Sequence, residues 1–463
     1  MSKLPQIFAE QFAFEPTADQ QEFINQICEF ILDDAQKMFL LKGYAGTGKT
    51  SLVSTLVKLL PQIKMKSVLM APTGRAAKVI GNYADRKAFT IHSKIYRQKH
   101  DKAGKMSLVL NYNMHEDTLF IVDEASMISN TASTTSGFGS RHVLNDLLDY
   151  VFAGNNCKLL LIGDLAQLPP VKLLVSPALD ENYLRNIDMF LKSVTIREVV
   201  RQSLDSGILQ NATLIRKHLQ QKDYSHPRFD VENFEDVQAV SSQDLEEVLD
   251  NSYSKYGFEN TMVITRSNKT ANKYNQQIRA RIRYIEDELI AGDFMMVVKN
   301  NYHWLKENKE NNLIANGDII EVLKVRQTEE AYGFRFANAL VSMVDYPDAE
   351  PIQVKMLLDV INDDAASIAS SRMKEFFDQL IAEQEHLKTW KKKLDAVKEN
   401  PFYNALQVKF AYAITCHKSQ GGQWDCVIVD KGYVPDDSVD VSYLRWLYTA
   451  ITRAKKQLYL VGF

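Results

Sequence analysis

The sequence predicts an α/β protein made of two units, each built on a mostly parallel sheet. Short apolar runs typical of buried strands alternate with helical stretches, at residues 38–41, 68–71, 119–122 and 159–162. A second series begins at residues 262–265 and resumes at 410–414, 427–429 and 458–461. Strands separated by helices favour a parallel sheet covered on both faces. The 463 residues exceed what one hydrophobic core supports, so we expect roughly two to four domains.

The composition is that of an ordinary globular protein, with 45% hydrophobic and 24% charged residues and a formal net charge of −3. A site for a polyanion must therefore be a local basic groove. The cysteines have no paired spacing, which argues against a zinc site or a disulfide framework and fits a reducing compartment; they are Cys28, Cys157, Cys416 and Cys426. The N-terminal stretch lacks the apolar core of a signal peptide, and no apolar run is long enough to span a membrane. We expect a soluble, cytoplasmic protein with no membrane partner.

The first strand is followed by a glycine-rich turn, GYAGTGKT, at residues 43–50, and then by a helical stretch. Glycines let backbone N–H groups turn toward a polyphosphate, and the helix N-terminus adds a favourable dipole. We expect Lys49 to reach the β- and γ-phosphates and Thr50 to hold Mg²⁺. The sequence therefore predicts that this loop binds a nucleoside triphosphate, through Gly43, Ala45, Gly46, Thr47, Gly48, Lys49, Thr50 and Ser51.

Polar residues follow two later strands. Asp123 and Glu124 end the apolar run 119–122. After a phosphate loop, Asp123 is expected to reach the Mg²⁺ ion and Glu124 to orient and activate an attacking water. Gln167 follows the run 159–162, and its amide can both donate and accept a hydrogen bond, which suits a sensor of the γ-phosphate. A plain turn at the strand end is the competing interpretation of Gln167.

Insertions interrupt both series. Between residues 92 and 117, apolar residues flank a basic, turn-like tip at 99–105, which predicts a hairpin. Residues 129–140 are rich in Ser, Thr and Gly and predict a surface loop. Alternating apolar residues with turn signals at 290–362 predict a small β-barrel module. Apolar residues at helical spacing between 373 and 397 predict one long amphipathic helix or two.

The order of these motifs resembles that of superfamily-1B DNA helicases, the group that contains the phage Dda helicase, RecD and the Pif-type helicases. The resemblance covers nearly the whole chain. Gln20 matches the Q motif, and 123–124 and 163–167 match motifs II and III. The remaining similarities are 71–78 to motif Ia, 90–93 to motif Ib, 199–202 to motif IV, 415–421 to motif V and 448–454 to motif VI.

The resemblance implies two RecA-like phosphate-loop NTPase domains in tandem. The first, domain 1A, is expected at residues 1–88 and 114–196, with an inserted pin hairpin, 1B, at 89–113. The second, domain 2A, is expected at 197–289 and 402–463, with an SH3-like domain 2B and its helical tower at 290–401.

The resemblance also implies roles for single residues in ATP binding and hydrolysis. Gln20 would recognise the adenine of ATP, and Gly421 would contact the nucleotide. Arg201 and Arg453, both from the second unit, would stabilise the negative charge that spreads over the transferring phosphoryl group. Docking of the second unit on the first would then depend on the γ-phosphate.

Single-stranded DNA is the expected partner, held across both units without reading of its sequence. The matching positions are Pro72, Thr73, Thr90, His92, Thr415, His417 and Ser419. Tyr96 and Tyr112 are candidates for separating duplex DNA at the pin, although a core-packing role suits them equally.

These expectations combine into an ATP- and Mg²⁺-dependent DNA helicase, active as a monomer, that moves 5′→3′ on single-stranded DNA and unwinds duplex DNA. The polarity comes from the family alone. Two alternatives stay open at this point. One is a DNA-stimulated ATPase that remodels protein–DNA complexes without unwinding, and the other is a nucleotide-gated subunit of a recombination complex.

Overall fold

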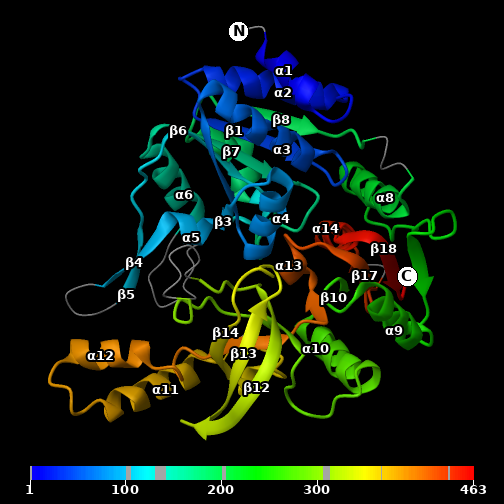
Figure 1. Ribbon diagram of the computed structural model, residues 1–463. Helices are drawn as coiled ribbons and strands as arrows, with labels where there is room; N and C mark the ends of the chain where they lie inside the picture. Colours follow the sequence, from blue (N-terminus) through cyan, green and yellow to red (C-terminus); the bar gives the residue numbers. More distant parts are fainter. Residues whose placement is uncertain are drawn as a thin grey trace.

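The computed structural model describes residues 3–100, 106–130, 142–200, 205–305, 313–365, 368–435 and 438–463. The first unit is a six-stranded parallel sheet with the order β3-β2-β6-β7-β1-β8 (Figure 1). Its strands are β1 (Met38–Gly43), β2 (Lys66–Ala71), β3 (Ala88–Thr90), β6 (Glu116–Val122), β7 (Asn155–Gly163) and β8 (Lys192–Ile196). Its helices are α1 (Leu4–Gln11), α2 (Ala18–Leu32), α3 (Lys49–Leu59), α4 (Gly74–Ala84), α5 (Ile91–Ile95), α6 (Val143–Phe152) and α7 (Glu181–Arg185).

Both faces of the first sheet are buried. Along β1, Phe39 and Leu41 belong to one hydrophobic cluster, whereas Met38 and Leu40 belong to another. Successive side chains of a strand point to opposite faces, so the two clusters are the two layers between the sheet and its helices. This explains why the run reads as continuously apolar, as parallel strands covered on both sides do.

The second unit is a five-stranded parallel sheet with the order β16-β10-β17-β18-β9. Its strands are β9 (Val237–Val240), β10 (Thr261–Thr265), β16 (Ala413–Thr415), β17 (Trp424–Asp430) and β18 (Ala454–Val461). Its helices are α8 (Gly207–Gln221), α9 (Leu245–Tyr256), α10 (Asn268–Gln277), α13 (Cys416–Ser419) and α14 (Val441–Ile451). The predicted architecture of two α/β units is confirmed, although β9 was not predicted.

The inserted module of the second unit is a closed barrel, as the sequence predicts. Its strands are β11 (Phe294–Val297), β12 (Ile319–Ala331), β13 (Phe334–Met343), β14 (Ile352–Leu357) and β15 (Leu406–Phe410). The single strand predicted at 410–414 is wrong, because the chain forms two strands there. Strand β15 closes the barrel between β11 and β14, and only β16 joins the parallel sheet. The barrel therefore extends past the bound predicted at residue 401.

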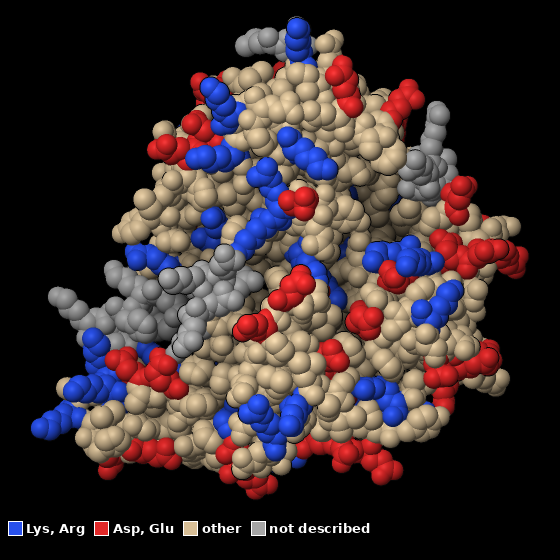
Figure 2. All heavy atoms as spheres, viewed as in Figure 1, with Lys and Arg blue, Asp and Glu red and all other residues tan. Residues whose placement is uncertain are grey.

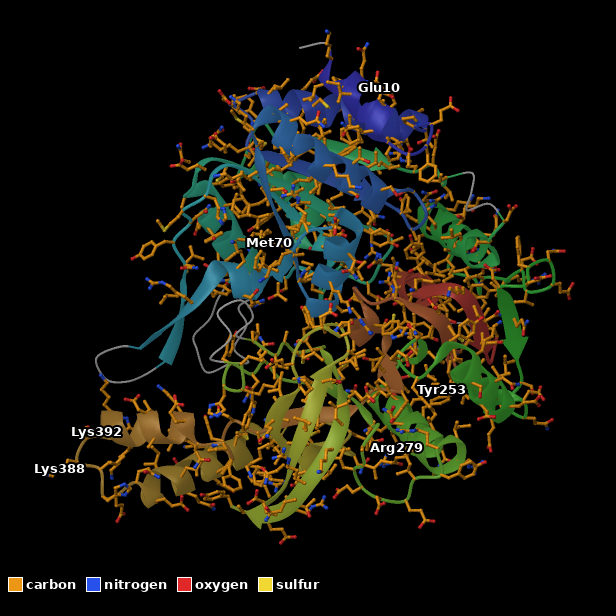
Figure 3. All side chains as sticks on the ribbon, viewed as in Figure 1. Glu10, Met70, Tyr253, Arg279, Lys388 and Lys392 are labelled. Carbon is orange, nitrogen blue, oxygen red and sulfur yellow. The ribbon has the colours of Figure 1, made fainter. Side chains whose placement is uncertain are left out.

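Two helices extend from the barrel, α11 (Ser370–Glu383) and α12 (Trp390–Glu399), so the helical insertion is a pair. They pack on the barrel through an aromatic cluster that includes Phe336 and Phe376. Figure 3 shows Lys388 and Lys392 at the end of this pair, pointing away from the body of the molecule. The predicted hairpin of the first unit is also present, as the antiparallel strands β4 (Tyr96–His100) and β5 (Met106–Leu110). Its tip, at 101–105, lies outside the described residues, as does most of the predicted loop at 129–140.

The barrel is tied to both units. Asp293, which is fully buried, binds the guanidinium groups of Arg279 and Arg283 at 2.9 and 3.0 Å and so fixes the barrel to α10 and its continuation. Toward the first unit, Arg75 of α4 pairs with Asp345 at 3.2 Å. Asp318 lies beside this ion pair. A methyl group added to Gly74 would stand 2.4 Å from Asp318 Oδ1. Glycine at position 74 thus lets α4 approach the barrel closely.

Charges are mixed over the face of the molecule in Figure 2, where Lys and Arg side chains in the middle of the face are flanked by Asp and Glu. This mixture agrees with the net charge of −3. Among the described residues, no helix combines the length and the apolar character needed to cross a bilayer.

Replacing Asp318 by Asn is expected to remove a pH dependence of stability. Burial raises the pKa of the Asp318 carboxyl from 3.8 to about 7. Between these pH values the folded chain binds a proton that the unfolded chain has lost. The free energy of unfolding therefore falls as pH rises, by at most about 1.4 kcal/mol per pH unit.

Asn has no charge to bury and keeps the acceptor for the Ala315 N–H, which lies 2.7 Å from Asp318 Oδ2. Urea unfolding should thus show Asp318→Asn more stable than the wild type at pH 8 and little different at about pH 4. Asp348→Asn is the control, because Asp348 is an exposed carboxyl on the loop between β13 and β14 that also carries Asp345; it should change neither value. A pH dependence as steep in Asp318→Asn as in the wild type would contradict the assignment.

Candidate functional site: a nucleotide cleft between two sheets

The phosphate loop connects β1 to α3 at the carboxyl edge of the first sheet. Gly46 and Gly48 have φ values of +74° and +78°, a left-handed conformation that glycine adopts without steric cost. The Thr47 hydroxyl and Lys49 Nζ donate to the carbonyl oxygen of Tyr44 at 2.8 and 2.7 Å. The loop thus curls around the Lys49 ammonium, the shape that a phosphate-binding nest requires.

Gln20 supports this loop from α2. Its side chain is 1% exposed, and its amide nitrogen donates to the Thr47 carbonyl at 2.9 Å. Its amide oxygen accepts from the Thr17 N–H at 3.0 Å, which completes a capping box at the start of α2. Recognition of adenine by Gln20 stays a prediction, and the structure adds a second role in holding the loop.

Two adjoining hollows open beside the loop, with volumes of about 730 and 280 Å³. Phe14 and Val200 line both. The smaller hollow also includes Gln20, Gly48 and Ser51. Apolar walls next to a polar phosphate cradle suit the base and ribose of a nucleotide.

Asp123 and Glu124 follow β6, next to the loop. Burial, and then the neighbouring Glu124 carboxylate, raise the pKa of Asp123 to about 6. Glu124 has a φ of +52°, a left-handed conformation, and its N–H donates to Asp123 Oδ1 at 2.8 Å. Mg²⁺ in nucleotide sites is commonly held by one or two protein ligands together with phosphate oxygens. Thr50 and Asp123 fit that pattern, and the described residues form no cluster of three or more metal-binding side chains.

Gln167 and Arg453 meet at Glu124, although they come from different units. With its amide oriented so that both ends have partners, Gln167 donates to Glu124 Oε2 at 3.2 Å and accepts from Arg453 Nη2 at 3.3 Å. Arg453 Nη1 lies 3.9 Å from Glu124 Oε1. The Arg453 side chain is 3% exposed and also donates to the carbonyl oxygens of Thr449 and Gly422. The structure thus brings together three predicted catalytic residues.

Arg201, the other catalytic residue predicted from the second unit, lies outside the described residues. The segment that leads to it runs along the phosphate loop. The Val200 N–H donates to the Gly46 carbonyl at 3.1 Å, and the Val200 side chain lies near Gly48. The role of Arg201 stays a prediction.

Sequence reasoning missed several residues that join the two units at this cleft. The Tyr448 hydroxyl contacts both Ala45 and Asp164. Thr449 and Gln420 bind the backbone of Leu168. All of them except Leu168, which directly follows the motif III stretch, lie within the stretches matched to motifs III, V and VI or the phosphate loop. The motifs were therefore recognisable in the sequence, but the sequence did not show which of their residues contact each other.

Most of the predicted DNA-contact residues lie at or next to helix N-termini. Thr73 and Thr90 cap α4 and α5 by accepting N–H bonds, and Thr415 is the N-cap residue of α13. Pro72, beside Thr73, is half-buried, and His417 is exposed. His92 is half-buried, and burial lowers its pKa. Ser419 is fully buried and donates to the Cys416 carbonyl at 2.8 Å, so its hydroxyl is unavailable to DNA in this structure.

Gly421 packs against the same region. Its φ is +73°, and a methyl group there would lie 2.7 Å from Ala76 and 2.9 Å from Thr73 Oγ1. Its neighbours therefore belong to the predicted DNA-contact stretch, and the nucleotide contact expected of it stays a prediction.

The two pin candidates differ. Tyr96 is 7% exposed and donates to Asp146 Oδ2 at 2.7 Å, which matches the core-packing interpretation. Tyr112 is 74% exposed, and its ring lies 4.7 Å from the Arg97 guanidinium. Only Tyr112 is accessible to a base pair.

Comparison with protein-family models gives two matches, in the order in which the units follow along the chain. An AAA domain matches residues 16–227, and a UvrD-like helicase C-terminal domain matches residues 410–461. The chain therefore combines a unit similar to an AAA domain with a unit similar to the C-terminal domain of UvrD-like helicases. The first match contains the phosphate loop, Asp123, Glu124 and Gln167, and the second contains Arg453.

Two relatives have low sequence identity to the chain but match it over nearly its whole length. An uncharacterized protein of Acanthamoeba polyphaga mimivirus is 25% identical over 95% of this chain and 98% of its own length. The ATP-dependent DNA helicase dda of Enterobacteria phage T4 is 23% identical over 96% of this chain and 99% of its own length. Among solved structures, a Bacteroides Pif1 helicase in complex with ADP-AlF3 and single-stranded DNA is 16% identical, covers 96% of this chain and 92% of its own, and has a TM-score of 0.46.

Gly48→Ala is expected to weaken nucleotide binding at the phosphate loop. A methyl group at Gly48 would stand 2.7 Å from the Gln20 amide nitrogen and would push the loop away from α2. We expect the dissociation constant of a fluorescent ADP analogue to rise by about tenfold or more, equivalent to 1.4 kcal/mol.

Gly432→Ala is the matched control, because Gly432 also has a positive φ, +60°, but no atom lies within 4 Å of the added methyl group. It should leave nucleotide affinity unchanged. Equal affinities in the two variants would show that contact between Gln20 and the loop does not shape the site.

Proposed function

We propose that this chain is an ATP- and Mg²⁺-dependent DNA helicase that moves 5′→3′ on single-stranded DNA and unwinds duplex DNA. The observation that carries the proposal is the meeting of Gln167 and Arg453 at Glu124. A carboxylate after β6, an amide after β7 and a buried arginine from the other unit form a hydrolytic site that depends on both units. The match to a UvrD-like helicase C-terminal domain and the name of the dda relative support the same function.

In the proposed reaction, backbone N–H groups of the loop and the Lys49 ammonium bind the β- and γ-phosphates. Mg²⁺, held by Thr50 and Asp123 when bound, would neutralise charge on these phosphates. Glu124 orients the attacking water and accepts its proton. Arg453 stabilises the charge that spreads over the transferring phosphoryl group. Gln167 contacts both Glu124 and Arg453, and so is placed to respond when the phosphate leaves.

The proposed DNA path uses groups that bind phosphate without reading bases. Thr73, Thr90 and Thr415 lie at helix N-termini, where free N–H groups and the helix dipole favour an anion. Thr73 belongs to the first unit and Thr415 to the second, and Gly421 packs against Thr73. A change in the distance between the units would therefore move one set of phosphate contacts relative to the other, which is the step of a translocase.

Glu124→Gln should separate nucleotide binding from turnover. Glutamine keeps the size of the side chain but cannot accept the proton from water, so we expect turnover to fall by about a hundredfold or more. ATP affinity should change little. Steady-state ATP hydrolysis with single-stranded DNA and titration with a fluorescent analogue measure the two quantities.

Glu116→Gln is the control, because Glu116 is an exposed carboxylate at the start of the same strand. Its turnover should equal that of the wild type. Unchanged turnover in Glu124→Gln would exclude Glu124 as the base.

Matched duplexes with a 5′ or a 3′ single-stranded tail test the activity and its polarity together. We expect ATP-dependent strand separation of the 5′-tailed duplex alone, and none by Lys49→Ala, which lacks the cation that binds the phosphates. Preference for the 3′ tail would contradict the proposed polarity. Hydrolysis stimulated by DNA without strand separation would favour a remodelling ATPase, and no hydrolysis with or without DNA would exclude a motor.

A further inference from the structure

Tyr448 connects two parts of the first unit from a helix of the second. It belongs to α14, and its side chain is 1% exposed. Its hydroxyl donates to Asp164 Oδ2 at 2.7 Å and accepts from the Ala45 N–H at 2.7 Å. Ala45 lies in the phosphate loop and Asp164 directly follows β7. One oxygen atom thus joins the loop to the turn that carries Gln167.

That turn is held on both sides of Gln167. Before it, Asp164 Oδ1 accepts from the Ala166 N–H at 2.8 Å. After it, the Leu168 N–H donates to Thr449 Oγ1 at 2.8 Å, and the Leu168 carbonyl accepts from Gln420 Nε2 at 2.6 Å. Ala166 and Leu168 also pack in the hydrophobic core of the second unit. The turn belongs to the first sheet by sequence, but its position depends on the second unit.

We propose that the Tyr448 hydroxyl is a positioning group that aligns the phosphate loop with Gln167, so that the hydrolytic site is complete only when α14 is docked. The inference rests on the proposed ATPase function. Tyr448 reaches none of the reacting groups; it acts through Asp164 and the turn on Gln167, which contacts Glu124 and Arg453.

The hydroxyl carries this role because it is buried together with the Asp164 carboxyl, while its other partner, Ala45, is half-buried. Asp164 is 1% exposed, and burial raises its pKa, whereas the hydrogen bond from Tyr448 favours the ionised carboxylate. Without the hydroxyl, the Ala45 N–H and Asp164 Oδ2 would each lose a buried partner. The loop and the turn would then no longer share a contact on α14, while the aromatic ring would still fill its place in the core.

Tyr448→Phe removes only the hydroxyl and therefore tests the proposal. We expect the kcat for ATP hydrolysis with single-stranded DNA to fall by about tenfold or more, with the KM for ATP within about threefold of the wild type. Stimulation of hydrolysis by DNA should also fall, since it requires the two units to act together. A loss of kcat without a rise in KM separates positioning of the reacting groups from weaker nucleotide binding.

Tyr443→Phe is the matched control, because Tyr443 lies on the same helix, is 3% exposed and contacts neither Ala45 nor Asp164. Its kcat should match the wild type. The proposal is overturned if Tyr448→Phe keeps its kcat, if it raises KM alone, or if Tyr443→Phe loses as much kcat. A wild-type chain that hydrolyses no ATP would instead overturn the proposed function.

If Tyr448→Phe unfolds at the assay temperature, Thr449 gives a second test of the same turn. Thr449→Ser keeps the acceptor for the Leu168 N–H, whereas Thr449→Val keeps the volume and removes the acceptor. Positioning of the turn predicts that only the Val variant loses kcat. Equal kcat values in these two variants would overturn the proposal.

Discussion

A parallel sheet brings the carboxyl ends of all its strands to one edge, and the cleft depends on this constraint. In the first unit β1 lies beside β7, and β7 lies beside β6. The registers pair Leu41 with Ile162 and Val122 with Leu161, so the three strands end at nearly the same level. The phosphate loop, Asp123 and Asp164 therefore lie side by side, although more than a hundred residues separate the first from the last. Their order along the edge follows from the strand order alone.

Contact across the cleft combines a few hydrogen bonds with apolar packing. Typical hydrogen bonds contribute only about 0.5–1.5 kcal/mol each, because the groups bind water when the surfaces separate. An interface of this kind can form and break within a catalytic cycle. Arg453 is the exception, since it is buried and its charge faces Glu124. A buried charge without partners is costly. The surroundings of Arg453 are therefore the part of the interface that is most sensitive to what occupies the cleft.

The barrel shows the same division between firm and adjustable contacts. Asp293 has two guanidinium partners and the Tyr412 hydroxyl, which satisfy the buried carboxylate toward the second unit. Toward the first unit, Asp318 Oδ1 has no hydrogen-bond partner among the described residues. The barrel is thus tied more firmly to the second unit. Strand β15 explains why the sequence misplaced this boundary. Residues 410–414 form a continuous apolar run, and its division between two sheets is decided by pairing with distant strands.

The sequence by itself determined the features that local chain geometry controls. The glycines and Lys49 of the phosphate loop, and the carboxylates after β6, lie at strand-to-turn junctions that a single segment specifies. The similarity to helicases was also readable from motif order. Tertiary structure decided which of these residues meet: Arg453 against Glu124, Tyr448 between Ala45 and Asp164, and Ser419 buried beneath the surface expected to bind DNA. These contacts join segments hundreds of residues apart, and no local pattern encodes the packing that brings them within hydrogen-bond distance.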